Sequence, residues 1–525
     1  MAKLIEHLPR LALLIVTLTI CVIAPASLSA QSQQRDQQLA KAQECFLRGD
    51  FEQARQQYKL AAEANPRSAQ ARIGLAQTLL KLDDWKSALA EADKAIAFGG
   101  NLGEALATLG SAQLRSGDPN AAGISFLRAL SQDIENHRAL VGLAQLRITR
   151  SQYDQALDHL RDAIRVAPDR PEGYYWLGEL LRLQRRYPEA ADAFEKFLSL
   201  NPKGHPENLR VEDLQGHIQL LRSFGQTTPF ALTGSAQTSI KMEFLMGLPV
   251  IKATVNGSQQ ATFILDTGAR DAVVIGEGLA ANLAAQKISR TVIYGIGGKQ
   301  QAWTARVDRL SLGDLTVHNI PAYVIDLELI SRALGQTVDG VMGLSWLSYS
   351  QVTFDFVARE VLIGPASLEE SLRELMQPEV AGRAPNFSIS LPFRLFNRQI
   401  IFPATVKGEP VSLLLDTGAQ HSLLSASFVS EHYKEDEIIQ RQLNSGGVGG
   451  MLPPQVAVVK DFQFQIADKI FPIASVPAVG ALDGNIGKRL DLRVAGIIGN
   501  LFLQNLSKLR IDYANQVLTW EFVGK

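Results

Sequence analysis

The chain has 525 residues, which at roughly 150 residues per domain predicts three or four folded units rather than one core. Hydrophobic residues make up 46% and charged residues 20% of the chain, a composition that excludes a largely disordered protein. The 52 basic and 53 acidic residues give a formal net charge of -1. No long-range positive field is available to attract a polyanion, so we do not expect nucleic-acid binding.

The first 30 residues have the pattern of a signal peptide. Lys3 and Arg10 precede an apolar run over residues 11–24, and small residues follow up to Ala30. The apolar run of about 14 residues is shorter than the roughly 20 that cross a bilayer, which makes an uncleaved anchor the less favoured alternative. We therefore predict an exported protein, periplasmic or secreted, that is cleaved after Ala30, with cleavage after Ser29 as the alternative. No later run is long enough for stable membrane insertion.

Cysteine and histidine usage argues against disulfides and metal sites. Cys45 is the only cysteine beyond the signal peptide, so no intramolecular disulfide can form in the mature chain. The eight histidines are scattered and lack the HExxH spacing of a zinc protease. We expect neither a metal nor another cofactor.

A step of 34 residues recurs between residues 34 and 202. Ring-bearing residues keep this step, and so does a series of alanines. The positions are Phe51, Trp85, Pro119, Tyr153 and Tyr187 for the rings and Ala54, Ala88, Ala122, Ala156 and Ala190 for the small side chains. Small residues at fixed points let paired helices approach closely, and a ring at the start of the second helix fills the space beside them.

This period and these positions resemble tetratricopeptide repeats. The resemblance implies an all-α solenoid of helical hairpins over residues 31–225, with five repeats and a capping helix within residues 205–224. It also implies a concave surface that binds a peptide or a protein partner. The alternative is that the array is only a spacer.

A segment rich in Gln, Thr, Ser and Gly, taken as a linker over residues 226–240, separates the array from a β-rich region. This region contains the same unit twice. The sequence ATVNGSQQATFILDTGA at residues 253–269 returns as ATVKGEPVSLLLDTGA at residues 404–419. Each copy continues with a glycine-rich turn, further strands, a hydrophobic Gly segment (GVMG or GIIG) and a final hairpin.

In this order and size, each copy resembles the retropepsin-like aspartyl proteases. The resemblance implies two all-β acid-protease barrels, one at residues 241–366 and one at residues 387–525, joined by a linker at residues 367–386. It implies a polypeptide substrate and an aspartic-type endopeptidase activity. The GVMG and GIIG segments would pack beneath the active loops.

Peptide hydrolysis without a metal or a nucleophilic side chain requires an activated water. Two carboxylates that share one proton can activate it, because one acts as base and the other as acid. The candidates are Asp266 and Asp416, each at the end of an apolar strand. By the resemblance, Thr267 and Thr417 would join the two loops by hydrogen bonds. The remaining support residues are Gly268, Ala269, Gly418, Ala419 and Ser422.

Two glycine-rich turns are interpreted as flaps that close over substrate, a motion that glycine permits. They consist of Gly295, Ile296, Gly297 and Gly298 in the first copy and Gly447, Val448, Gly449 and Gly450 in the second. Two other acidic residues, Asp355 and Asp512, are expected to fix the last hairpin of each copy.

The first copy departs from the family pattern near its aspartate. Six residues after the aspartate the family has Ser or Thr, which Ser422 satisfies, whereas the first copy has Ala272. The competence of the first copy therefore stays open. The short linker favours one intramolecular cleft, with two sites between chains as the alternative. The leading function is an exported aspartic endopeptidase, and the rival is a peptide-binding scaffold without catalysis.

Overall fold

The computed structural model describes most of the chain. The described residues are 33, 35–200, 211–270, 273–348, 350–368, 386–442, 446–447, 450–451, 455–484 and 492–523. The predicted signal peptide, Ala272, Val448, Gly449 and residues 369–385 of the expected linker lie outside them. Among the described residues, no helix combines the length and apolar character that a membrane span requires.

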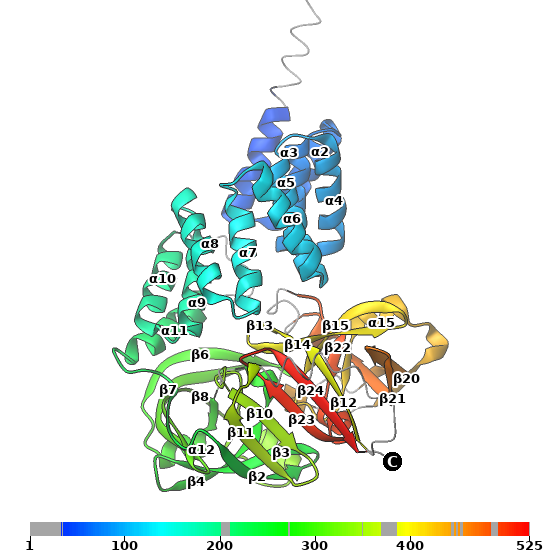
Figure 1. Cartoon of the computed structure of the whole chain (residues 1–525). Helices are drawn as coiled ribbons and strands as arrows, with labels where there is room; N and C mark the ends of the chain where they lie inside the picture. Colours follow the sequence, from blue (N-terminus) through cyan, green and yellow to red (C-terminus); the bar gives the residue numbers. More distant parts are fainter. Residues whose placement is uncertain are drawn as a thin grey trace, which may run out of the picture.

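The N-terminal part is an array of helical hairpins that lies beside the β-rich part (Figure 1). Its first helix covers residues 35–48. The others are α2 (Phe51–Ala64), α3 (Ala69–Lys81), α4 (Trp85–Phe98), α5 (Leu102–Ser116), α6 (Pro119–Gln132), α7 (His137–Thr149), α8 (Tyr153–Val166), α9 (Pro171–Leu183), α10 (Tyr187–Leu200) and α11 (Val211–Ser223). Ring residues of the 34-residue step begin the even-numbered helices α2 to α10, and the predicted hairpin array is confirmed.

Small side chains and side-chain caps explain the array's local structure. The alanines of the series at 54, 88, 122, 156 and 190 have no exposed surface. Gly110 lies against the ring of Phe126, where an added Cβ would come within 2.7 Å of the ring. Asn101 and Asn136 accept hydrogen bonds from backbone amides in the first turns of α5 and α7, which satisfies donors that a helix start leaves unpaired.

The first copy of the β unit begins earlier than expected. Its elements are β1 (Ala231–Gly234), β2 (Thr238–Leu245), β3 (Leu248–Val255), β4 (Gln259–Leu265), β5 (Val273–Gly276), α12 (Glu277–Asn282), β6 (Lys287–Gly295), β7 (Gly298–Leu312), β8 (Leu315–Ile325), α13 (Glu328–Leu334), β9 (Gly340–Met342), β10 (Ser350–Asp355) and β11 (Glu360–Pro365). Residues 226–240 therefore contain β1 and the start of β2. This segment joins the barrel because β1 pairs with β8, with Ala231 opposite His318.

The second copy follows the same order. Its elements are β12 (Asn386–Pro392), β13 (Arg394–Phe396), β14 (Gln399–Val406), β15 (Glu409–Leu415), β16 (Leu423–Ser425), α15 (Ala426–His432), β17 (Ile438–Gln442), β18 (Gly446–Gly447), β19 (Gly450–Met451), β20 (Gln455–Ile466), β21 (Lys469–Val479), β22 (Gly496–Ile498), α17 (Asn500–Leu503), β23 (Leu506–Asp512) and β24 (Val517–Val523). Two protease-like β units thus follow the helical array.

One continuous run of strands joins the two copies. The order β12-β24-β23-β10-β11-β2 places the final hairpin of each copy side by side. The joint is the antiparallel pair β10–β23, in which Gln351 lies opposite Asp512 and Asp355 opposite Lys508. Buried residues of both copies, with Trp520 and Phe354 among them, form one hydrophobic cluster. The two copies therefore fold against each other within one chain.

The array contacts both copies. Toward the second copy, the backbone amide of Arg493 donates to the carbonyl of Arg115 at 3.1 Å, and Glu431 pairs with Lys86 at 2.7 Å. Toward the first copy, Arg185 donates to the carbonyl oxygens of Phe230 and Trp346, both at 2.9 Å. The array is thus packed against the protease-like part at several separate points.

Candidate active site

Both aspartates lie at the end of a strand that pairs in parallel with a hydrophobic Gly strand. In the first copy β4 pairs with β9, with Leu265 opposite Met342, and the amide of Asp266 donates to the Met342 carbonyl at 3.0 Å. In the second copy β15 pairs with β22 in the same way, and the amide of Asp416 donates to the Ile498 carbonyl at 3.1 Å. The GVMG and GIIG segments therefore hold the start of each loop.

The two carboxyl groups meet in one site. A side-chain hydrogen bond joins Asp266 and Asp416. Asp266 Oδ1 accepts from the amides of Gly268 at 2.7 Å and Ala269 at 3.0 Å. Asp416 Oδ1 accepts from the corresponding amides of the second copy at 2.9 and 3.1 Å. Both aspartates keep part of their surface exposed, so a water or substrate atom can reach them.

Only glycine fits at the third position of each DTGA segment, because the opposite aspartate leaves no room for a side chain. A Cβ added at Gly268 would lie 2.6 Å from a carboxylate oxygen of Asp416, and one added at Gly418 would collide with the carboxyl group of Asp266. Each loop can therefore approach the opposite aspartate only because it carries glycine at this point.

Four hydrogen bonds made by the threonines join the loops beneath the aspartates. The Thr267 amide donates to Thr417 Oγ1 at 3.1 Å, and the Thr417 amide donates to Thr267 Oγ1 at 3.0 Å. Each hydroxyl also donates across the boundary, Thr267 to the Leu415 carbonyl at 2.9 Å and Thr417 to the Leu265 carbonyl at 2.8 Å. Both threonines are buried, so the cross-link is shielded from competing water.

The environment favours a proton on the pair. Burial, the neighbouring Asp416 charge and the hydrogen bond to Asp416 hold the pKa of Asp266 well above its usual value, against the opposing effect of the Gly268 and Ala269 amides. Burial also raises the pKa of Asp416, while hydrogen bonds from Asp266 and from backbone amides act in the opposite direction. The two carboxyl groups therefore titrate as one pair, which keeps a proton to a higher pH than an ordinary aspartate does.

The two glycine-rich turns meet each other. The hairpin of β6 and β7 pairs Gly295 with Gly298, and β18 and β19 pair Gly447 with Gly450. At Gly297 there is no space for a Cβ, because the backbone of Gly450 occupies it. The tips of both turns are therefore in contact. Val448 and Gly449 lie outside the described residues.

A cavity of about 890 Å³ lies beside the turn tips. Ile296 and Gly297 of the first copy border it, and the rest of its lining belongs to the second copy. This lining includes the apolar side chains of Val429, Val456 and Val479. Neither aspartate borders the cavity, so this cavity is separate from the pair of carboxyl groups.

The two copies support their DTGA loops differently. In the second copy Ser422 Oγ accepts from the Gly499 amide at 3.1 Å. The alanine at position 272 in the first copy has no hydroxyl for such a bond. The first DTGA loop is instead supported from the second copy, where Gln399 Nε2 donates to the Gly268 carbonyl at 2.8 Å. Sequence reasoning missed Gln399, because its partner is 131 residues away and no local pattern marks it.

The two other aspartates identified in the sequence, Asp355 and Asp512, make hydrogen bonds within their own hairpins. Asp355 Oδ1 accepts from the amides of Val357 and Ala358 at 3.1 and 2.8 Å. Asp512 Oδ1 accepts from the Asn515 amide at 2.9 Å. The expected role of both residues in the last hairpins is confirmed. Within the described parts of the chain, no group of three or more His, Cys, Asp or Glu side chains is arranged to hold a metal ion.

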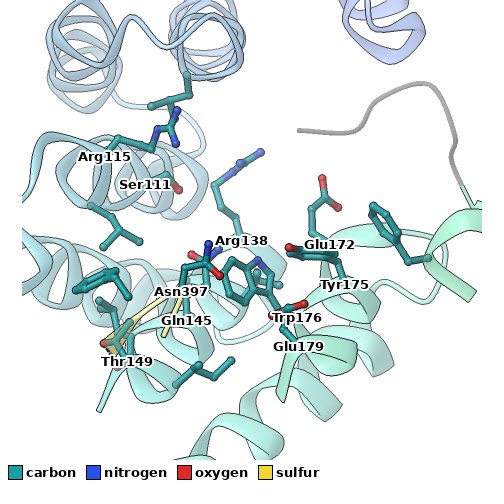
Figure 2. Close-up of a pocket in the computed structure, with 18 of the residues that line it drawn as sticks. Ser111, Arg115, Arg138, Gln145, Thr149, Glu172, Tyr175, Trp176, Glu179 and Asn397 are labelled. Atoms are coloured by element: carbon teal, nitrogen blue, oxygen red, sulfur yellow. Dashed lines mark hydrogen bonds between the residues drawn. The ribbon is translucent and has the colours of Figure 1, made fainter. Parts of the chain in front are cut away.

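The array has a second candidate site on its inner face. A cavity of about 280 Å³ is lined by α3, α5, α7 and α9 and by residues 395–398 of the second copy. Figure 2 shows Asn397 among side chains of these helices. The cationic lining residues are Lys81, Arg115, Arg138, Arg170, Arg182 and Arg398, and the acidic ones are Asp83, Glu172 and Glu179. The cavity is thus bounded by both the array and the protease-like part.

Comparison with known families agrees with this division. An aspartyl protease family model matches residues 251–346 and 402–501. Two tetratricopeptide repeat models match residues 46–112 and 141–205. No curated protein matches the chain.

Each of three similar solved structures covers about a third of this chain. A thermophilic tetratricopeptide repeat protein of Thermus thermophilus is 20% identical, with a TM-score of 0.31, over 36% of this chain and 99% of its own. PilF of Pseudomonas aeruginosa is 22% identical, with a TM-score of 0.28, over 37% of this chain and 82% of its own. YrrB, described as a tetratricopeptide repeat protein with an unusual peptide-binding site, is 19% identical, with a TM-score of 0.23, over 31% of this chain and 85% of its own.

Proposed function

Because this chain carries two aspartyl protease segments behind tetratricopeptide repeats, we propose that it is an exported aspartic endopeptidase with an array for protein interaction. The observation that carries the proposal is the hydrogen-bonded pair of Asp266 and Asp416. The pair lies on two loops that the threonines join. This arrangement supplies one acid and one base at the same point.

The reaction follows from the protonation of the pair. A water bound between the carboxyl groups gives one proton to the ionised Asp416 while its oxygen attacks the carbonyl carbon of the peptide. Protonated Asp266 gives its proton to the carbonyl oxygen, which forms a neutral tetrahedral diol. Asp416 then returns a proton to the amide nitrogen and a diol hydroxyl returns one to Asp266, so the C–N bond breaks and the pair regains its single proton.

The flaps and the array complete the proposal. The touching turns at Gly297 and Gly450 must separate to admit an extended chain and close over it, which excludes water from the reacting bond. The array supports recruitment of a protein or peptide partner, because its inner face retains a cavity. A peptide-binding scaffold without catalysis is the outcome that an inactive wild-type chain would support.

Export is the part of the proposal that depends on the N-terminal sequence. We expect expression of the full chain in a Gram-negative host to yield a periplasmic protein whose first residue is Gln31. Intact-mass measurement of the periplasmic fraction checks this. A chain that keeps residues 1–30, or that stays in the cytoplasm while a known exported control is processed, contradicts it.

The pH profile tests the shared proton. Activity needs one proton on the pair, so it is lost at low pH when Asp416 is protonated and at high pH when Asp266 is ionised. Because both pKa values are raised, we expect a bell-shaped profile that lies above the usual aspartate value of about 3.9. The measurement is kcat/KM for one peptide from a mixed library across acid to neutral pH. A falling limb at or below pH ~4 contradicts the assignment.

A further inference from the structure

The turn that joins β13 to β14 has an unfavourable backbone for its sequence. Asn397 and Arg398 both have positive φ, 46° and 66°. A two-residue hairpin with this geometry prefers glycine at the second position, and the matching turn of the first copy has Gly247 there, with φ 87°. Arginine adopts this conformation less readily than glycine does, because its Cβ crowds the backbone. The contacts of the Arg398 side chain therefore need to be considered.

Arg398 is buried and links separate parts of the molecule. Only 5% of its surface is exposed. Its Nη2 donates to the Ser345 carbonyl in the first copy, and its Nη1 is 3.5 Å from the Tyr153 hydroxyl in the array. The Ser345 amide in turn donates to the carbonyl of Arg270 at 3.3 Å. Arg398 therefore connects the array to the segment that follows the first DTGA loop.

The next residue reaches the catalytic loop itself. Gln399 Nε2 donates to the Gly268 carbonyl at 2.8 Å. That carbonyl belongs to the same peptide unit as the Ala269 amide, which donates to Asp266 Oδ1 at 3.0 Å. A donor on the carbonyl side of a peptide both fixes its plane and strengthens the bond made by its N–H. Gln399 thus acts on Asp266 through one rigid peptide.

The same turn forms part of the array's cavity. Asn397 and Arg398 line it together with array residues such as Arg138 and Trp176, and Figure 2 shows Asn397 among them. An array-bound partner and the first catalytic loop would therefore contact opposite sides of one turn, which is a physical route for coupling.

We propose that residues 397–399 form a positioning turn: Gln399 orients the peptide that donates to Asp266, and Arg398 anchors Gln399 to the array. This inference rests on the proposed function for its kinetic consequences. Gln399 gives the first DTGA loop a supporting hydrogen bond of its own, whereas in the second copy Ser422 accepts from the Gly499 amide. Arg398 and Gln399 are positioning residues, since neither touches the reacting atoms.

The first test is Gln399→Met, which keeps length and neutrality but removes the donor. Asp416 and the Gly268 and Ala269 amides are the groups that act on Asp266, and weakening the Ala269 bond raises the pKa of Asp266 further. We expect kcat to fall roughly tenfold, as for one lost hydrogen bond, with KM unchanged. The falling limb of the pH profile should move to higher pH, which a merely structural role would not cause.

The matched control is Gln504→Met. Gln504 Nε2 donates to the Gly247 carbonyl at 2.7 Å, the corresponding turn of the first copy, and that carbonyl is not part of a catalytic loop. We expect this variant to leave the pH profile in place. Arg398→Gly should shift the profile in the same direction as Gln399→Met, although it relieves the backbone of the turn. The double variant should be no worse than Gln399→Met, because Arg398 acts through Gln399.

A second readout needs no cleavage. A raised pKa in the folded state means that stability falls as pH rises through that pKa, so in Gln399→Met the decline of the melting temperature should extend to higher pH. If the wild-type chain is inactive but this shift appears, the endopeptidase proposal fails and the positioning turn stands. If the wild-type chain is active and neither profile moves in Gln399→Met, the positioning turn is overturned.

Discussion

Replacing either Asp266 or Asp416 by asparagine is expected to abolish peptide cleavage. One proton is shared by one pair of side chains, so each variant lacks either the acid or the base. A loss of at least about 10²–10⁴-fold in kcat/KM is expected from the removal of an acid–base group. The measurement is cleavage of a peptide that the wild-type chain hydrolyses. The matched control is Asp468→Asn, an exposed aspartate 3.8 Å from Lys469, which should retain full activity.

Mixing the two variants decides whether one chain forms the whole site. If each chain contains one cleft, as the joint between β10 and β23 implies, a mixture of Asp266→Asn and Asp416→Asn chains stays inactive. Recovery of activity in the mixture, with a dependence on protein concentration, contradicts the intramolecular site. Partial activity in one single variant contradicts a shared pair.

The melting temperature of Asp266→Asn shows whether the variant loses activity because it lacks the carboxyl group or because it does not fold. The introduced amide side chain would still accept from the loop amides and donate to Asp416, as protonated Asp266 does. Because burial and the Asp416 charge raise the pKa of Asp266, the wild-type site becomes less stable as pH rises through that pKa. We therefore expect Asp266→Asn to melt above the wild type at neutral pH and close to it in acid. Unfolding of the variant at neutral pH contradicts this.

Replacing Thr417 by valine is expected to weaken the joint between the two copies. Valine has nearly the same shape but lacks the hydroxyl, which leaves the Thr267 amide and the Leu265 carbonyl without the partners they have here. Each buried group left unpaired costs about 1–3 kcal/mol, so the free energy of unfolding should fall by about 2–6 kcal/mol. Activity should fall as well, because the loops lose their alignment. Urea denaturation and kcat measure the two effects.

Thr405→Val provides the matched control for this substitution. Thr405 is half-buried near the end of β14, opposite Pro410, away from the DTGA loops. The same loss of a hydroxyl there should change the free energy of unfolding by less than about 1 kcal/mol. Equal destabilisation by both variants would contradict a special role for the threonine cross-link.

Local patterns in the sequence were sufficient to recognise the kinds of units and their order. The 34-residue step predicts paired helices, because small and ring residues recur at the same positions in each repeat. The duplicated DTGA segments predict two aspartates at strand ends, because an apolar strand followed by a glycine turn is a local signal. Both signals lie within short stretches of chain, so they needed no knowledge of distant contacts.

Those local patterns could not predict contacts between segments that are distant in the sequence. The segment interpreted as a linker contains β1, a strand of four largely exposed residues that pairs with residues about His318. Gln399 and Gly268 are brought together across the boundary of the copies, and the turn at Arg398 enters the inner face of the array. Spacing along the chain does not specify which surfaces of separately recognisable units pack together.

The two residues of the candidate dyad could therefore be identified from the sequence, whereas their proximity depends on tertiary contacts. Asp266 and Asp416 share a site because β10 and β23 pair and because the threonine hydroxyls cross between the loops. Hydrogen bonds and packing between segments more than a hundred residues apart arise only when all the elements are in place. That is why the kinds of side chain were predictable, and why the asymmetric support by Gln399 was visible only in the tertiary structure.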